Sequence, residues 1–404
     1  MATRPPSFTI TGRVRDACFS PERPPAQQLV AVSSRPLPLL FYSVRFPVCL
    51  LASALLAAPS AAPALESSGL QPVGTVIACT RTAQGVQLAC ADGATVFVSL
   101  LAPDLVRVRT LFAGQPAAPD HSWAIARTDW PAPDWQLRED PAAITLTTAE
   151  LEVVIHRAPL LVEFRDAATH RLINADARPA ARDPKSGALA AAKRLGFDEH
   201  FYGLGEKAAR LDRRRGKFTM WNSDTPGYTA GTDPIYQSVP FYLGVDAGQA
   251  YGIFYDNSHR ATFEFGFLTQ ESADYSAAGG VLDYYFFHGP ALKKILGRYT
   301  ELTGRMPLPP LWALGHQQSR YSYYPAAMVE QVVAQYRARN LPLDVVHLDI
   351  HYMDAYRVFT WNQDRFPDPA GLTTRLARQG VRVITIIDPG VKYQPANPAA
   401  PGTD

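Results

Sequence analysis

Residues 343–354 read Leu-Asp-Val-Val-His-Leu-Asp-Ile-His-Tyr-Met-Asp, a short apolar run that passes directly into carboxylates and aromatic rings. The part at 343–350 predicts a buried strand, because short, valine-rich apolar runs are typical of parallel sheets. Apolar runs at 311–317 and 381–387 predict one further strand on each side of it.

The segments between these strands have helical patterns. One helix opens with Pro325 in its first turn, and its apolar stripe consists of Met328, Val332, Val333 and Tyr336. A second helix covers 369–379 and stops at Gly380. The order β-α-β-α-β with parallel strands is the opening of a TIM barrel or of a doubly wound sheet.

The region 72–290 shows short alternating or apolar runs separated by turn residues, which is typical of an all-β sandwich. The clearest predicted strands are 95–101, 106–111, 143–148, 151–156, 160–164, 239–245, 251–255 and 282–288. The polar, alanine-rich stretch 178–194 predicts a long loop.

A predicted helix at 291–303 ends at Gly304, and a proline-rich joint follows at 307–310. The domain boundary is therefore expected here, with a sandwich at 72–305 and the first strands and helices of a barrel at 306–404. A chain of 404 residues is long enough for two such domains.

Residues 1–64 predict an N-terminal extension and a secretory signal. An apolar run at 48–58 follows Arg45, and small residues at 62–64 suit cleavage near Ala64. A membrane anchor is the alternative, but the run is shorter than the roughly 20 residues of a spanning helix. We expect a periplasmic or extracellular protein with no membrane span after cleavage, starting at Met1 or near Val44.

Export makes a disulfide chemically possible. Cys79 and Cys90 flank the dipeptide 84–85, and a hairpin turn there would place the two thiols opposite each other. Two buried free cysteines are the alternative. The net charge of +2 is mixed along the chain and does not suggest a nucleic-acid partner, and no Cys/His spacing suggests a metal.

Each of the three predicted barrel strands is followed by a segment with polar, acidic or aromatic side chains, at 319–324, 349–354 and 388–390. The carboxyl ends of parallel strands share one edge of a sheet, where such folds bind their ligands. Carboxylates can hold sugar hydroxyls and aromatic rings can stack on sugar rings, so a carbohydrate pocket is expected there.

Five segments resemble glycoside hydrolase family 31, the α-glucosidase and α-xylosidase group. Residues 315–321 and 348–354 are similar to its first two barrel strands and loops, and 359–369 to its bacterial members. Upstream, 201–207 and 221–225 resemble the family's galactose-mutarotase-like sandwich and a loop that reaches toward the active site.

The resemblance implies roles for single residues. Asp349 would hold sugar hydroxyls where the bond is cut, with Ile350 and Ile386 as an apolar wall and Tyr321 as an aromatic wall. Asp224, from the sandwich loop, would cap the same pocket. The substrate would be an α-linked oligosaccharide or α-glycoside.

Alternatives remain for several positions. A strand-end carboxylate such as Asp349 can instead cap backbone N–H groups. Asp388 precedes a proline, which suits a turn as well as substrate contact. Trp361, a weaker candidate, and Tyr323 suit packing or the rim, and His351 stands where the family commonly has aspartate.

The family's mechanism is retaining hydrolysis, which needs two carboxyl groups about 5 Å apart and no cofactor. The family places both of these aspartates, the nucleophile and the acid/base, in later motifs that these 404 residues do not contain. The resemblance therefore implies that no catalytic residue lies in this chain and that the catalytic pair is expected beyond Asp404.

Three strands also cannot close an eight-stranded barrel. We therefore expect an incomplete reading frame or a fragment, inactive by itself. An α-xylosidase or transglycosylase, and a non-catalytic sugar-binding remnant, are the alternatives. Linkage and oligomeric state stay open.

Overall fold

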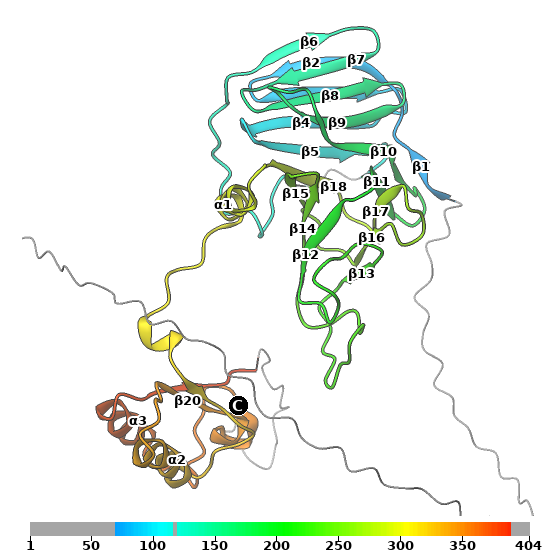
Figure 1. Cartoon of the computed structure of the whole chain (residues 1–404). Helices are drawn as coiled ribbons and strands as arrows, with labels where there is room; N and C mark the ends of the chain where they lie inside the picture. The colour runs from blue at the N-terminus through cyan, green and yellow to red at the C-terminus, as the bar shows by residue number, and fades with distance from the viewer. Residues whose placement is uncertain (1–68, 116–118, 389–404) are drawn as a thin grey trace, which may run out of the picture. The chain divides into compact units, whose positions relative to one another are not determined.

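The computed structural model describes residues 69–115 and 119–388 (Figure 1). The expected signal sequence lies outside these residues, and so do the segment after Asp388 and the catalytic pair that is expected beyond Asp404. Within the described part of the chain, none of the helices is both long and apolar enough to cross a lipid bilayer.

The N-terminal domain consists of two antiparallel sheets and one helix. The strands of the first sheet, in spatial order with β1 beside β10, are β13 (Lys217–Met220), β16 (Ala261–Phe265), β17 (Ser272–Ala277), β11 (Leu189–Arg194), β10 (Leu172–Arg182), β9 (Leu160–Asp166), β8 (Leu151–Arg157), β7 (Ala143–Thr147), β6 (Gln136–Glu139) and β1 (Gln71–Pro72). The strands of the second are β12 (His200–Gly205), β14 (Ser238–Asp246), β15 (Gln249–Tyr255), β18 (Leu282–His288), β5 (Leu105–Leu111), β4 (Thr95–Ala102), β3 (Gly85–Cys90) and β2 (Val76–Thr82).

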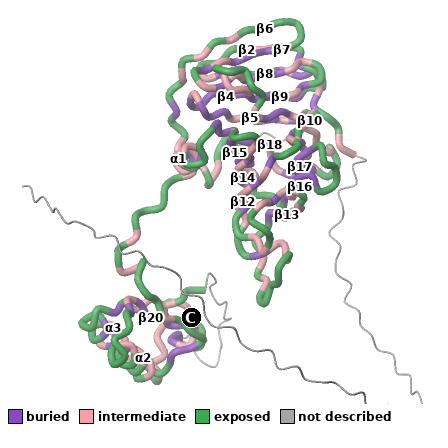
Figure 2. Tube along the Cα trace, viewed as in Figure 1, coloured by how far each residue is buried: buried purple, intermediate pink, exposed green. Residues whose placement is uncertain are grey.

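The alternating sequence pattern produces this sandwich. Along β4 every second residue is buried, so one face of the strand enters the core (Figure 2). The two sheets meet through aromatic rings, with Phe164 stacked on Phe286 at 3.9 Å and Phe201 on Phe265 at 4.4 Å. The predicted sandwich is confirmed, and each of the eight predicted strands is present.

The prediction of a long loop at 178–194 is wrong, because the two halves of this stretch belong to β10 and β11, which pair with each other. On its outer sides, this hairpin pairs with two further strands: β10 pairs with β9, and β11 pairs with β17. Lys193 is only 2% exposed, and its Nζ lies 2.6 Å from Asp176 Oδ1 and donates to Tyr284 Oη at 3.0 Å. One of the charged residues of this stretch is therefore a buried partner in an ion pair rather than part of a solvated loop.

Of the two alternatives for the cysteines, the structure has free thiols rather than a disulfide: Cys90 is buried and Cys79 is partly buried. The turn between β2 and β3 falls at 83–84, one residue earlier than the disulfide requires, so Cys79 is paired with Leu88 and Cys90 with Val76. Burial raises the pKa of both thiols, that of Cys90 to about 11.

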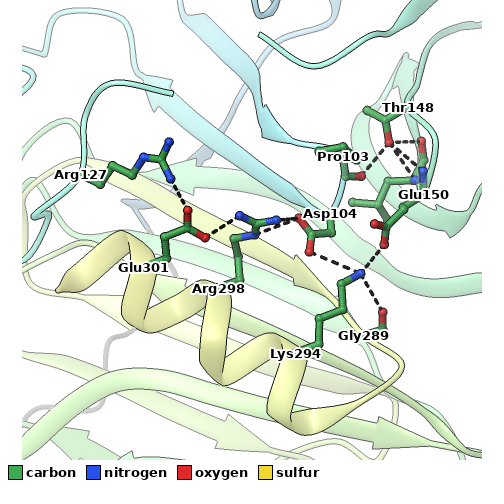
Figure 3. A network of polar contacts seen from close by, with 10 residues as sticks. Pro103, Asp104, Arg127, Thr148, Glu150, Gly289, Lys294, Arg298 and Glu301 are labelled. Atoms are coloured by element: carbon green, nitrogen blue, oxygen red, sulfur yellow. Dashed lines mark hydrogen bonds and ion pairs between the residues drawn. The ribbon is translucent and has the colours of Figure 1, made fainter. Parts of the chain in front are cut away.

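Helix α1 (Leu292–Thr303) packs on the second sheet and ends at Gly304, as predicted. Its charged side chains surround the buried carboxylate of Asp104, which lies between β4 and β5 (Figure 3). Arg298 Nη2 lies 2.9 Å from Asp104 Oδ1, and Lys294 Nζ lies 3.3 Å from Asp104 Oδ2. Glu301 accepts from Arg298 at 2.6 Å and extends the network to Arg127.

After the proline-rich joint, the chain forms a three-stranded parallel sheet with two helices. Its elements are η2 (Leu311–Leu314), β19 (Gln317–Gln318), α2 (Ala326–Ala338), β20 (Val345–Leu348), η3 (Ile350–Tyr352), η4 (Asp354–Tyr356), α3 (Pro369–Arg378) and β21 (Arg382–Thr385). The order β-α-β-α-β with parallel pairing is confirmed. The first strand is shorter than expected, because 311–314 forms a 3-10 turn after the prolines.

The core of this part lies between the helices and the sheet. Val329 and Val333 of α2 and Leu372 and Leu376 of α3 are buried against β20 and its neighbours. Asp368 caps α3 by accepting a hydrogen bond from the Gly371 N–H at 2.8 Å. The strands are thereby held with their carboxyl ends on one edge.

Candidate functional site

The loops that follow β19, β20 and β21 begin at the same edge of the parallel sheet. The second and third loops are joined directly: the Ile386 N–H donates to Leu348 O at 2.9 Å, and Tyr352 Oη donates to Ile386 O at 2.8 Å. This edge is where a β/α fold binds its ligands.

Asp349 is half-buried at the end of β20. Its Oδ1 accepts a hydrogen bond from the Ile350 N–H at 2.7 Å and thereby caps η3. Its second carboxylate oxygen makes no hydrogen bond with the described residues. The capping role and the sugar-binding role are therefore compatible, since one oxygen fixes the side chain and the other can accept from a hydroxyl.

His351 lies at the centre of an aromatic cluster that joins the first two loops. Tyr324 stacks on its ring at 4.7 Å, while Tyr321 and Tyr356 approach edge-on at 5.1 Å and 5.8 Å. Its Nδ1 lies 2.9 Å from the hydroxyl oxygen of the buried Ser322. Tyr321 is 71% exposed, so its ring is held at the edge and presented outward.

Arg365 contacts two members of this aromatic cluster, Tyr324 and His351. Its guanidinium lies 4.7 Å from the centre of the Tyr324 ring, and its Nη1 donates to His351 O at 3.2 Å. Tyr356 has a left-handed φ of 62°, which is unusual for a bulky residue and is characteristic of functional loops. Sequence patterns did not reveal Tyr324, Tyr356 or Arg365 as partners of His351.

The remaining predicted residues differ in exposure. Ile350 packs partly against the core of the barrel part, whereas Ile386 is 40% exposed at the edge. Trp361 packs against Tyr352 at 5.0 Å, as expected for a packing residue. Tyr323 is likewise buried. Asp388 is exposed at the end of the described chain.

Asp224 belongs to the sandwich, in the long connection 221–237 between β13 and β14. The two ends of this connection are fastened by a buried ion pair. Lys207 Nζ lies 2.7 Å from Asp233 Oδ1 and donates to Thr219 O at 2.6 Å. Lys207 closes the motif at 201–207, so that motif now has a structural role in shaping the loop that carries Asp224.

Asp224 is exposed on this loop beside a pair of tyrosines. Tyr228 and Tyr236 meet edge-on at 6.0 Å. Desolvation and then the charge of Asp224 raise the pKa of Tyr236. The loop therefore presents an acidic group with aromatic neighbours, a combination suited to sugars.

The described chain is a β-sandwich followed by parallel β/α units, with carboxylates and exposed aromatic rings at the strand ends, and so has a sandwich-and-barrel architecture. Residues 95–264 match the glycosyl hydrolase 31 N-terminal galactose mutarotase-like domain, and residues 306–403 match the glycosyl hydrolases family 31 TIM-barrel domain. The chain belongs to glycoside hydrolase family 31.

Its relatives include Alpha-glucosidase 2 of Bacillus thermoamyloliquefaciens, 44% identical over 65% of this chain and 33% of the relative. Alpha-xylosidase XylQ of Lactiplantibacillus pentosus is 30% identical over 64% of this chain and 34% of the relative. A family 31 dextranase from Flavobacterium johnsoniae, solved with isomaltotriose, has a TM-score of 0.73 and 29% identity over 78% of this chain and 38% of its own. The chain thus spans about a third of the length of these relatives.

Proposed function

We propose that the chain forms the N-terminal part of an α-glycosidase that hydrolyses α-linked oligosaccharides or α-glycosides with retention of configuration. The observation that carries this proposal is the shared edge of the parallel sheet, where Tyr321, Asp349 and Ile386 lie in or beside loops that match the family. Asp349 offers an acceptor for sugar hydroxyls, and the other two offer an aromatic and an aliphatic wall.

Bond cleavage is assigned to a later part of the complete enzyme, beyond Asp404. Retention requires a nucleophile and an acid/base carboxyl about 5 Å apart. Asp349 and Asp388 match positions that bind rather than cleave, so the 404-residue chain is expected to bind sugar without hydrolysing it. A non-catalytic sugar-binding protein is the alternative, and activity of the complete gene product distinguishes the two.

An α-glucoside is the proposed substrate, and Alpha-glucosidase 2 supports this choice by its similarity. An α-xyloside is the second candidate, favoured by the similarity to XylQ. The complete protein should be assayed with p-nitrophenyl α-glucoside and p-nitrophenyl α-xyloside. Product analysis with maltose as acceptor then separates hydrolysis from transglycosylation.

Asp349→Asn in the complete protein tests the binding role. Loss of a charge-assisted hydrogen bond to the substrate should lower kcat/KM by about tenfold to a hundredfold. Asp364→Asn, at an exposed carboxylate in the same part of the fold, is the matched control and should leave kcat/KM unchanged. Equal kinetics for the two variants would contradict the proposed role of Asp349.

We also propose that the protein is exported. The support is the signal-like pattern of residues 46–64. N-terminal sequencing of protein recovered from the periplasm or medium should find a first residue close to Leu65. Recovery of the intact N-terminus in the cytoplasm would contradict export.

A further inference from the structure

Two neighbouring hollows on the sandwich form one groove, and none of the residues that line it belongs to the barrel part. One has a volume of about 590 Å³ and is lined by Trp123, and the other has a volume of about 350 Å³ and is lined by Trp221. The two hollows share four lining residues, Pro240, Asn257, Ser258 and His259. We call this continuous surface the tryptophan groove.

Both tryptophans present their rings to solvent. Trp123 is 96% exposed and Trp221 is 47% exposed, although tryptophan is normally among the highly buried residues. The Trp123 ring touches only the edge of His121, at 5.0 Å, among the ring contacts of the described chain. Exposed aromatic rings in a concave surface are suited to stacking on a ligand.

The segment that carries Trp123 is fixed rather than loosely attached. Arg107 binds the Asp120 carboxylate through two nitrogens, at 2.6 Å and 3.1 Å, and also binds the buried Asp283. Two residues further on, Ser122 Oγ donates to Asp256 Oδ1 at 2.7 Å. Trp123 therefore follows two anchor points, and little conformational entropy would be lost when a ligand stacks on it.

The middle of the groove is equally well fixed. The Asn257 side-chain amide donates to Gly279 O at 2.9 Å and Val281 O at 3.2 Å, and its oxygen accepts from the His259 N–H at 2.9 Å. The side chains of Ser258 and His259 are exposed and make no hydrogen bond with the described residues. They offer hydrogen-bond donors and acceptors on a backbone that Asn257 holds in place.

The other end of the groove is tied to the start of β14. The Trp221 N–H donates to Ser238 Oγ at 2.9 Å, and the Ser238 N–H donates to Asn222 Oδ1 at 2.8 Å. Trp221 also lies three residues before Asp224 in the same connection. The groove therefore begins on the loop that carries a proposed substrate residue.

We propose that the tryptophan groove binds a neutral oligosaccharide, with Trp123 and Trp221 stacked on sugar rings and His259 and Ser258 bonded to hydroxyls. The charges nearest Trp123 are paired within the protein, which favours an uncharged ligand over an anionic one. This inference rests on the proposed function for its class of ligand, an α-linked glucan.

The test is binding of maltohexaose and isomaltohexaose to the 404-residue chain, measured by calorimetry. Trp123→Ala should weaken the binding of at least one of the two glucans by about tenfold or more, since truncated tryptophans are typical hot spots. Trp123→Phe keeps a ring and should recover most of the affinity. Phe197→Ala, at a fully exposed aromatic ring outside the groove, is the matched control and should bind as the unmodified chain does.

Binding of both glucans by Trp123→Ala with unchanged affinity, or no binding of either by the unmodified chain, would overturn the proposal. Binding that is lost equally with Phe197→Ala would overturn it as well. Failure of the proposed function looks different: the complete protein would cleave neither aryl α-glycoside, while Trp123→Ala would still lower glucan affinity. Conversely, if the complete protein cleaves a short aryl glycoside and Trp123→Ala leaves glucan affinity unchanged, only the proposal for the tryptophan groove is rejected.

Discussion

Replacement of Asp104 by alanine should destabilise the sandwich more than any change at the rim of the same network (Figure 3). The Asp104 carboxylate is 2% exposed; its Oδ1 accepts a hydrogen bond from Arg298 Nε at 3.0 Å and lies 2.9 Å from Arg298 Nη2. Oδ2 faces Lys294 Nζ at 3.3 Å. The single carboxylate thus pairs with two cations of helix α1.

The expected loss of unfolding free energy follows from the cations that Asp104→Ala leaves without this carboxylate. Removing one partner of a buried ion pair destabilises a protein by about 3–5 kcal/mol, because the remaining charge is uncompensated. Here Arg298 and Lys294 are 25% and 35% exposed and keep Glu301 and Glu150 as partners. We therefore expect the lower end, about 3 kcal/mol, which corresponds to a fall in Tm of about 6–12 °C for a domain of this size.

Guanidinium and thermal unfolding of the chain, followed by tryptophan fluorescence, provide the assay. Glu301→Gln is the control, because Glu301 is 29% exposed and its ion pairs should contribute under about 1 kcal/mol. The double variant Asp104→Ala/Arg298→Ala should destabilise less than the sum of its parts. The reasoning is refuted if Asp104→Ala unfolds within about 1 kcal/mol of the unmodified chain or if Glu301→Gln is equally destabilising.

Burial first, and then the charge of Lys294, lowers the pKa of His288, so the unfolded chain binds a proton at this residue more readily than the folded chain does. The stability from neutral His288 is therefore present above about pH 6.5 and is lost below it. His288→Gln should flatten the fall in unfolding midpoint between about pH 7.5 and 5.5. Because Cys79 and Cys90 are free, dithiothreitol should leave the Tm unchanged, and both thiols should react with a thiol reagent after unfolding. A Tm that falls when reductant is added would instead indicate a disulfide. Lys207→Met leaves the Asp233 carboxylate without its buried cation, so limited proteolysis should cut within 221–237 faster, and an unchanged cleavage rate would rule out this anchoring role.

The sandwich could be predicted because burial and strand period coincide in its sequence. Strand β18 is buried throughout and is apolar except for Asp283 and His288, and β4 alternates as its burial does. The hairpin at 178–194 carries no such signal, since alanines and charged residues are read as a polar loop. Its strands are specified by pairing with β9 and β17 and by the contact between Lys193 and Asp176, which are tertiary effects.

The candidate site could be predicted only to the level of its motifs. Residues such as Asp349 and Tyr321 stand at strand ends, and chain order alone places them on one edge. The ring contact between His351 and Tyr356 depends on the left-handed conformation of Tyr356, for which tyrosine has no preference. Partners of this kind are set by loop geometry and have no local sequence signature.

His351 shows how this geometry changes the meaning of a substitution. The family commonly has aspartate there, and a carboxylate could accept hydrogen bonds from sugar hydroxyls. The imidazole instead stacks on Tyr324, meets the edge of Tyr321 and places Nδ1 at the hydroxyl of Ser322. A carboxylate has no ring to stack in this way, so the histidine positions the exposed Tyr321 ring. In this chain the position therefore holds the exposed Tyr321 ring in place, and under the proposed function Asp349 is the carboxylate at this edge that accepts from sugar hydroxyls.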